Sequence, residues 1–223
     1  MNITPDSIIF WQFGIIKLNA TIVLTWVVMF ILAAGSWLLT RRLKKASRST
    51  QAETLLEIVI GFVYLNLQEL GLKAPERYID FIGTLFIFIG FCGILTIVPG
   101  YIPPTGSLST TAALAISVFI AVPMYAIQEK GLIGYLKNYL RPVFIYLPFN
   151  IIGEFTRTLA LAVRLFGNAM SGALLIAIII SLSPIFFPIF VHVLDLITSL
   201  VQAYIFTVLA TVYIAAATRT YDT

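Results

Sequence analysis

The sequence predicts an all-α integral membrane protein with about five membrane helices and one interfacial amphipathic helix. Of the 223 residues, 60% are hydrophobic and only 11% are charged, and the mean hydropathy is +0.99. A soluble domain carries about 25% charge. Five apolar segments are long enough to cross about 30 Å of hydrocarbon as helices. Too few residues remain for a large soluble domain, so we expect one membrane domain over residues 1–223.

The first predicted membrane helix is an outer helix over residues 20–40. The basic cluster Arg41, Arg42, Lys44, Lys45 and Arg48 follows its apolar part. Residues 1–7 lack the positive region of a signal peptide, so we expect this first span to remain as an anchor. Residues 51–72 mix Glu53, Glu57 and Glu69 with apolar residues. That mixture favours a helix at the membrane interface or against a partner.

A helical hairpin is predicted over residues 79–127. Its two apolar spans cover about residues 79–97 and 110–127, and the stretch 99–106 between them is rich in turn-forming Pro and Gly. A polar loop is predicted over residues 128–141.

The last predicted element is a pair of unusually long helices over residues 146–219. If helical, the segments 146–182 and 183–219 are each about 55 Å long, nearly twice the hydrocarbon thickness. We therefore expect the pair to lie far from the membrane normal, by about 50° or more, or to bend strongly. The alternative is four shorter helices, which the absence of Pro after Pro188 disfavours for the last segment.

The basic residues predict the orientation. Of the 14 Lys and Arg, all except Lys17, Arg157 and Arg164 fall on one side if five spans alternate. This pattern predicts an outside N-terminus and a cytoplasmic C-terminus. The sequence has no internal repeat, which disfavours an inverted-repeat transporter.

Arg164 lies near the midpoint of the 146–182 segment. A guanidinium does not deprotonate in proteins, so it cannot become neutral in hydrocarbon. Placing it in the middle of a membrane costs from about 3 to over 10 kcal/mol, depending on how far water and lipid adapt. A cost of this size indicates a functional charge.

Further polar residues share faces of the last two predicted helices. The first of these helices carries Glu154, Arg157, Arg164, Asn168 and Ser171, and the second carries His192, Asp195, Thr198, Ser199 and Gln202. Glu154 precedes Arg157 by one turn, a spacing that permits an ion pair. Antiparallel packing would bring Gln202 to the depth of Arg164.

Most of these residues also have a purely structural interpretation. Glu154 and Arg157 can pair near the headgroups, and His192 can be a hydrogen-bonded helix residue. Ser171, Thr198 and Ser199 can bond to their own backbone, and Gln202 can join two helices. Gly167 and Gly172 are expected to permit the close approach of another helix.

Other function classes find little support. The single Cys92 forms no internal disulfide, and no phosphate-binding loop, metal-ligand spacing or Ser/His/Asp set is present. The net charge of +4 reflects the loops, so a nucleic-acid partner is not expected. The polar faces instead indicate an ion path. A fixed positive charge would bar direct passage of cations and would keep a nearby carboxylate ionised.

Several motifs resemble those of subunit a of F-type ATP synthases. They are Arg164–Asn168, Gln202–Thr207, Thr84–Phe86, Val98–Gly100 and Thr110–Ala115. The resemblance covers about residue 18 to the C-terminus. It implies an outer helix, an interfacial helix, a hairpin and two long tilted helices against a rotor ring of c subunits, in agreement with the apolar segment lengths.

The resemblance also implies roles for individual residues. Arg164 is then the stator arginine that faces the ring carboxylate and separates two half-channels, with Gln202 beside it and Asn168 along the adjacent path. Asp195 falls at a relay position of the outer half-channel, and Arg157 matches a basic position before the signature. The expected ion-translocation set is completed by Glu154, Ser171, His192 and Ser199.

Three positions depart from the family pattern. Many relatives have an acid or histidine at Ala173, a carboxylate at Asn150 and a proline at Thr158. These departures argue against the usual proton relay. The short N-terminus and the stretch Ala215–Arg219 resemble a subgroup proposed to move sodium, so both ions stay open.

The predicted function is a non-catalytic, ion-conducting stator subunit without a cofactor or a bound metal. The expected partners are the c ring, the b subunits of the peripheral stalk, the rest of the F1Fo complex, membrane lipid and the transported H⁺ or Na⁺. The expected location is the bacterial plasma (inner) membrane, or the thylakoid in a photosynthetic host. A stand-alone secondary transporter and a purely structural scaffold are the alternatives; the first lacks a repeat, and Arg164 argues against the second.

Overall fold

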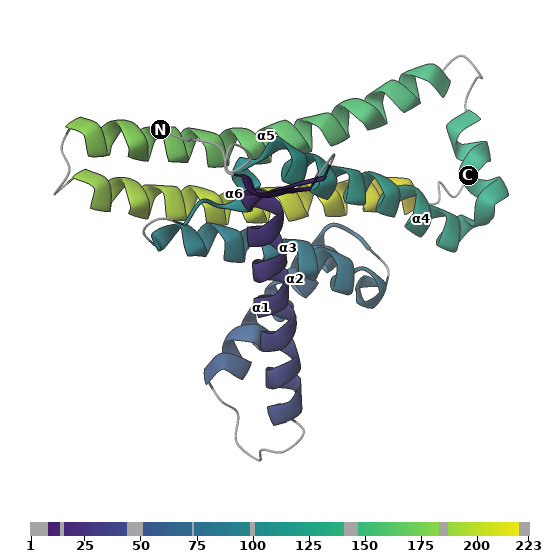
Figure 1. The fold of residues 1–223 in the computed structure, drawn as a ribbon. Helices are drawn as coiled ribbons and strands as arrows, with labels where there is room; N and C mark the ends of the chain where they lie inside the picture. The colour runs from purple at the N-terminus through teal and green to yellow at the C-terminus, as the bar shows by residue number, and fades with distance from the viewer. Residues whose placement is uncertain are drawn as a thin grey trace.

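The structure is a computed structural model that describes residues 9–13, 16–43, 51–72, 74–98, 101–140, 147–182 and 187–218. Its helices are α1 (Ala20–Leu43), α2 (Gln51–Glu69), α3 (Ile79–Ile94), α4 (Leu108–Leu140), α5 (Leu147–Leu182) and α6 (Phe187–Thr218). The short 3-10 helices η2 (Pro75–Arg77), η3 (Leu95–Ile97) and η4 (Pro104–Gly106) lie between them. Figure 1 shows α1 running across the direction of α5 and α6.

Five of these helices, all except α2, are long and apolar enough to cross a membrane. The all-α membrane fold class is therefore confirmed. The interfacial placement of α2 stays a prediction. Some predicted features fall outside the described residues: residues 1–7, Lys44, Lys45, Arg48, Lys73, Pro99, Gly100, Arg141, Ser183, Pro184 and Arg219.

A short β-hairpin precedes α1 and was not predicted from the sequence. Strand β1 (Ile9–Phe13) pairs in antiparallel fashion with β2 (Ile16–Asn19), and Trp11 lies opposite Leu18. Isoleucine and aromatic residues, which favour strands, make up most of β1, whereas β2 alternates apolar with polar residues. The hairpin adds a small β element to a helical membrane protein.

Helix α4 corrects the predicted loop over residues 128–141. The helix continues to Leu140 with one break at Gly131, where φ is 73° and ψ is 165°. Glycine adopts a positive φ at no steric cost, because it lacks a Cβ. The polar residues Gln128, Glu129 and Lys130 interrupt the apolar pattern but continue the helix to this break.

Helices α5 and α6 are each continuous, so the alternative of four shorter helices is wrong. At 1.5 Å per residue, the 36 residues of α5 span about 54 Å and the 32 residues of α6 about 48 Å. The two helices lie side by side and antiparallel (Figure 1). Their orientation across α1 supports the predicted strong tilt of the pair.

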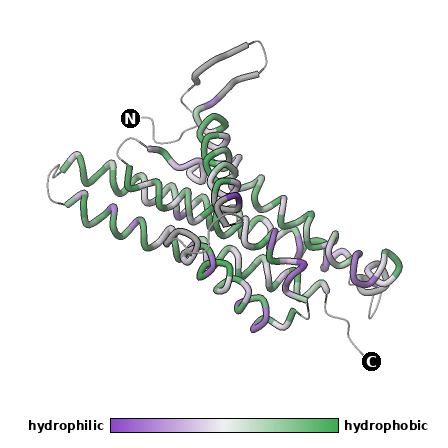
Figure 2. Tube along the Cα trace, turned by 90° about the horizontal axis from the view of Figure 1, so that it is seen from below, coloured by the Kyte–Doolittle hydropathy of each residue, from purple (hydrophilic) through white to green (hydrophobic). Residues whose placement is uncertain are grey.

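The core lies where α6 meets α3, α4 and α5. Ala203, Phe206, Ala210 and Ile214 are fully buried along one face of α6. Only 6% of the apolar window of α5 is buried, against 44% of that of α6. Hydrophobic residues follow both helices along their length (Figure 2). The outer face of α5 is therefore an exposed apolar surface.

Candidate functional site

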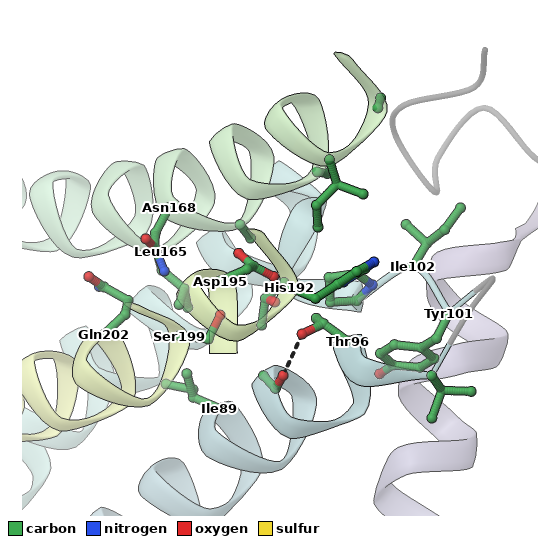
Figure 3. Close-up of a pocket in the computed structure, with 18 of the residues that line it drawn as sticks. Ile89, Thr96, Tyr101, Ile102, Leu165, Asn168, His192, Asp195, Ser199 and Gln202 are labelled. Carbon is green, nitrogen blue, oxygen red and sulfur yellow. Dashed lines mark hydrogen bonds between the residues drawn. The ribbon is translucent and has the colours of Figure 1, made fainter. Parts of the chain in front are cut away.

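A cavity of about 560 Å³ lies between the end of α3, the segment that follows it, and helices α5 and α6. Its polar lining comes from Thr96, Tyr101, Thr105, Asn168, His192, Asp195, Ser199 and Gln202. Figure 3 shows Asp195, Ser199 and Gln202 along α6, with Asn168 on α5. The remaining lining is largely apolar. The cavity has room for several water molecules, which its polar groups can hold by hydrogen bonds.

Asp195 is the carboxylate of this cavity, and only 9% of it is exposed. A Cβ built on Gly172 of α5 would overlap its Oδ1 and lie 2.9 Å from its Cγ. The missing side chain of Gly172 therefore makes room for the carboxylate. Thr96 lines the same cavity, and its hydroxyl donates to the Gly93 carbonyl at 2.7 Å (Figure 3).

Gln202 and His192 bring unsatisfied hydrogen-bonding atoms to the cavity. Within the described part of the chain, Gln202 Nε2 and His192 Nδ1 are buried without a hydrogen-bond partner. A buried polar atom without a partner is costly, and ordered water is the usual remedy. These two atoms therefore fit a hydrated cavity better than a dry helix contact.

Ser199 lies where α6 touches α3. A Cβ built on Gly93 would be 2.7 Å from Ser199 Cβ, so the two helices are in close contact there. Ser199 lines the cavity beside this contact. Close approach of another helix was expected at Gly167 and Gly172. It occurs at Gly172, whereas a Cβ on Gly167 would meet nothing within 4 Å.

Arg164 is exposed on α5 and is not among the residues that line the cavity. Its neighbour Leu165 is 3% exposed and does line the cavity. Successive residues on a helix point about 100° apart. Arg164 therefore lies on the outer face of α5, next to the wall of the cavity.

Glu154 and Arg157 lie about three and two turns before Arg164 on α5, outside the cavity lining. The Arg157 guanidinium is 5.8 Å from the centroid of the Tyr213 ring of α6, a cation–π distance. The spacing-based pairing of Glu154 with Arg157 stays a prediction. Ser171 is exposed, and its hydroxyl donates to the Asn168 carbonyl at 3.0 Å, in line with its structural interpretation.

Thr96 and Tyr101 are cavity residues that the sequence analysis missed. Both lie near the predicted turn after the second span, where polar residues attract little notice. The available signal was a lone hydroxyl, Thr96, three residues after Gly93 in an apolar run. Burial raises the pKa of the Tyr101 phenol, so this group is a neutral hydrogen-bonding side chain at physiological pH.

Known proteins resemble this chain over almost its whole length. The family model described as ATP synthase A chain matches residues 22–215. ATP synthase subunit a 1 of Chlorobaculum parvum is 56% identical over 220 residues, which cover 99% of this chain and 97% of that relative. ATP synthase subunit a of Albidiferax ferrireducens is 56% identical over 219 residues, with 98% and 95% covered. ATP synthase subunit a 2 of Acaryochloris marina is 52% identical over 219 residues, with 98% and 94% covered.

The chain belongs to the ATP synthase A chain family. Membership confirms the family resemblance seen in the motifs and, at the level of the family, the ion-conducting stator role in the membrane sector of ATP synthase. The other subunits of that complex are accordingly its partners, and the membrane is its location. In this family, the exposed Arg164 and the partly open cavity beside it are the two features that bear on ion conduction.

Proposed function

We propose that the chain forms two half-channels, one on each side of Arg164, which carry protons to and from the carboxylates of a ring of c subunits. The observation that carries this proposal is the position of Arg164. It is exposed on the outer face of α5, while the next residue, Leu165, is buried in the cavity wall. The charge can therefore contact a partner while it lies next to the cavity.

The guanidinium would act as an electrostatic partition. A fixed positive charge repels a cation that approaches along the helix surface. It also favours the ionised form of a carboxylate that comes within about 4–6 Å. A ring carboxylate would therefore release its proton near Arg164 and take up another beyond it. Ions could then cross only while bound to the ring.

The cavity is the proposed outer half-channel. Asp195 is the one carboxylate among its described lining residues, and Thr96 of η3 with His192 and Ser199 of α6 supplies further hydrogen-bonding groups. Gln202 and Asn168 also line it, and they lie toward the depth of Arg164. A proton can move along such groups and the water between them by successive hydrogen-bond exchanges.

The second half-channel is proposed on the side of Glu154 and Arg157. These residues precede Arg164 by ten and seven positions, or about 15 and 10 Å along α5. The distribution of basic residues places this end of α5 toward the cytoplasm. Ser171 follows Arg164 by seven residues on the exposed α5 face, so we place it on the outer side of the path.

The c ring is the proposed partner of the outer face of α5. Large apolar side chains are exposed along this face: Phe149, Phe155, Leu159, Val163, Leu175 and Ile178. Lipid could cover such residues, but lipid would leave Arg164 in hydrocarbon at high cost. A ring that presents a carboxylate would cover the apolar side chains and would also pair with Arg164. The b subunits of the peripheral stalk would hold the chain as a stator that catalyses no reaction itself.

The proposed placement is a bacterial plasma membrane, or a thylakoid in a photosynthetic host, with an outside N-terminus and a cytoplasmic C-terminus. Sodium is the alternative coupling ion, because Ala173 and Asn150 remove two acidic positions of the usual proton relay.

The partition is tested by Arg164→Ala in the assembled complex in reconstituted vesicles. We expect coupled ATP synthesis to be abolished while the subunits still assemble, because the charge is exposed and supports no core contact. Arg77→Ala is the control, since it removes an exposed arginine of η2 that lies outside the proposed ion path. Normal ATP-driven pumping by Arg164→Ala would overturn the proposal.

The coupling ion is tested by radiolabelled sodium uptake during ATP hydrolysis, with and without an uncoupler. Proton coupling predicts that all transport collapses when the uncoupler is added. Sodium uptake that persists would establish sodium as the coupling ion and leave the partition intact.

A further inference from the structure

Lys130, at the end of the first part of α4, reaches the last turn of α6. Its Nζ donates a hydrogen bond of 2.8 Å to the backbone carbonyl of Ala217. The last four carbonyls of a helix lack intrahelical partners and carry a partial negative charge. An ammonium group at this position satisfies one of these carbonyls and opposes that charge. The contact joins two helices that lie far apart in the sequence.

The neighbouring residue, Glu129, ties the same point to the start of α3. The Tyr78 hydroxyl donates to Glu129 Oε1 at 2.9 Å. Tyr78 is 1% exposed, and its ring meets that of Tyr125 edge-on at 4.9 Å between centroids. Gly131 then breaks the helix. Two consecutive residues of α4 therefore make these contacts. Glu129 binds Tyr78, the residue before α3, and Lys130 binds Ala217 of α6.

Beside Ala203 and Ser199, α6 meets α3 through small residues, whereas the large buried side chains Phe206 and Ile214 lie closer to the C-terminal end of α6. A Cβ built on Gly90 would lie 3.9 Å from Ala203 Cβ, and Gly93 faces Ser199. Small residues permit close approach of helices but provide no large side chain that interlocks along the axis. A second polar contact, from the Tyr204 hydroxyl to Asn66 Oδ1 at 3.2 Å, lies at an exposed position.

The axial position of α6 matters for the proposed ion path. A shift of one residue moves a helix by 1.5 Å along its axis and corresponds to a turn of 100°. A shift of that kind would carry Gln202 and Asp195 away from the cavity. The ring is proposed to move along the strongly tilted pair, so the reaction force would act partly along the axis of α6. A contact at the end of the helix opposes that force directly.

We propose that Lys130 is a positioning residue, which fixes α6 along its axis through Ala217 and thereby holds Gln202 and Asp195 in the ion path. The inference rests on the proposed function for its consequence in coupling, but the helix position itself can be measured separately.

The position of α6 is read from a disulfide between Gly90→Cys and Ala203→Cys in a Cys92→Ala background, in the assembled complex. The Cβ separation of 3.9 Å matches the mean of about 3.8 Å in disulfides. We expect Lys130→Met to slow disulfide formation about tenfold, the loss of one charged hydrogen bond. Lys130→Arg should restore the rate, and Arg77→Met, which removes an exposed cation from η2, should leave it unchanged.

Coupled ATP synthesis should fall with the disulfide rate in Lys130→Met, at an unchanged amount of complex in the membrane. The inference is overturned if Lys130→Met forms the disulfide at the original rate, or if Lys130→Arg is as slow as Lys130→Met. If Lys130→Met lowers the amount of complex, Lys130→Gln replaces it, because it keeps a donor without the charge, and the same outcomes apply. Because the disulfide reports helix position alone, failure of the Arg164 partition would not change this result.

Discussion

Helices α5 and α6 are similar in length and hydropathy but differ in their surroundings. Helix α6 has 44% of its apolar window buried, with fully buried residues such as Phe206 and Ile214 along one face. Helix α5 has 6% buried and carries its arginine on the outside. One helix is therefore part of the core of the subunit, and the other presents a surface to a partner. Substitutions on the two helices should have different kinds of effect.

The largest expected difference is between two phenylalanines. Phe206 of α6 is 0% exposed and Phe155 of α5 is 63% exposed. Phe206→Ala should lower the free energy of unfolding by about 3–5 kcal/mol, because it leaves a core cavity. Phe155→Ala should leave the free energy of unfolding nearly unchanged and weaken association with the proposed c ring instead. Denaturation of the purified subunit in detergent, followed by circular dichroism, measures the first effect. Equal losses for both variants would remove the distinction between the helices.

A pair of glycines on α5 gives the next comparison. A methyl group at Gly172 would overlap the Asp195 carboxylate, whereas Gly167 has nothing within 4 Å. Gly172→Ala should cost about 1–3 kcal/mol through overpacking, and ion conduction should fall as Asp195 is displaced. Gly167→Ala should be neutral or stabilising by up to about 1 kcal/mol, since alanine favours helix. The same denaturation assay checks both, and a tolerated Gly172→Ala would show that α5 and α6 separate easily.

Gln202 separates stability from function within α6. Its Nε2 is buried without a partner in the described chain, and burying an unsatisfied donor costs about 1–3 kcal/mol unless water supplies the bond. Gln202→Met removes the donor at similar volume, so stability should stay the same or rise while ion conduction falls. A clear loss of stability would mean that Gln202 acts as a structural link between helices.

The smallest effect concerns Tyr78, beside the end of α6. Burial, with the hydrogen bond to Glu129, raises the pKa of Tyr78 from 10.0 to about 12. Because the folded pKa lies above the unfolded one, the associated stability is present below pH 10 and is lost as the pH rises toward 12. Tyr78→Phe should cost about 1 kcal/mol below pH 10 and should show a smaller alkaline loss. Denaturation curves at pH 8 to 12 would contradict this if both proteins lost stability in parallel.

The fold could be predicted from the sequence wherever the length of an apolar segment was the signal. The continuous helices α5 and α6 were predictable because their apolar runs exceed the membrane thickness. The helical segment after residue 127 was not, because Gln128, Glu129 and Lys130 resemble a loop in composition. Only tertiary contacts at Tyr78 and Ala217 explain why they continue the helix.

The candidate site was predictable in part. Charged and amide side chains in an apolar run, such as Asp195 and Gln202, stand out because their burial is costly. Thr96 did not stand out, because a hydroxyl can bond to its own helix and is cheap to bury. The relation of Gly172 to Asp195 was also hidden, since it depends on how two helices cross and not on either sequence alone.

The length of α5 has a mechanical consequence. Packed helices lie about 10 Å apart, so a helix of about 54 Å could contact more than one helix of a ring at once. As such a ring turns, one neighbour leaves at one end of α5 while another arrives at the other end. The total contact area then stays nearly constant through each step, so apolar adhesion opposes the motion little. The apolar surface would therefore favour no single rotor position, and the charge of Arg164 would define the position of each rotational step.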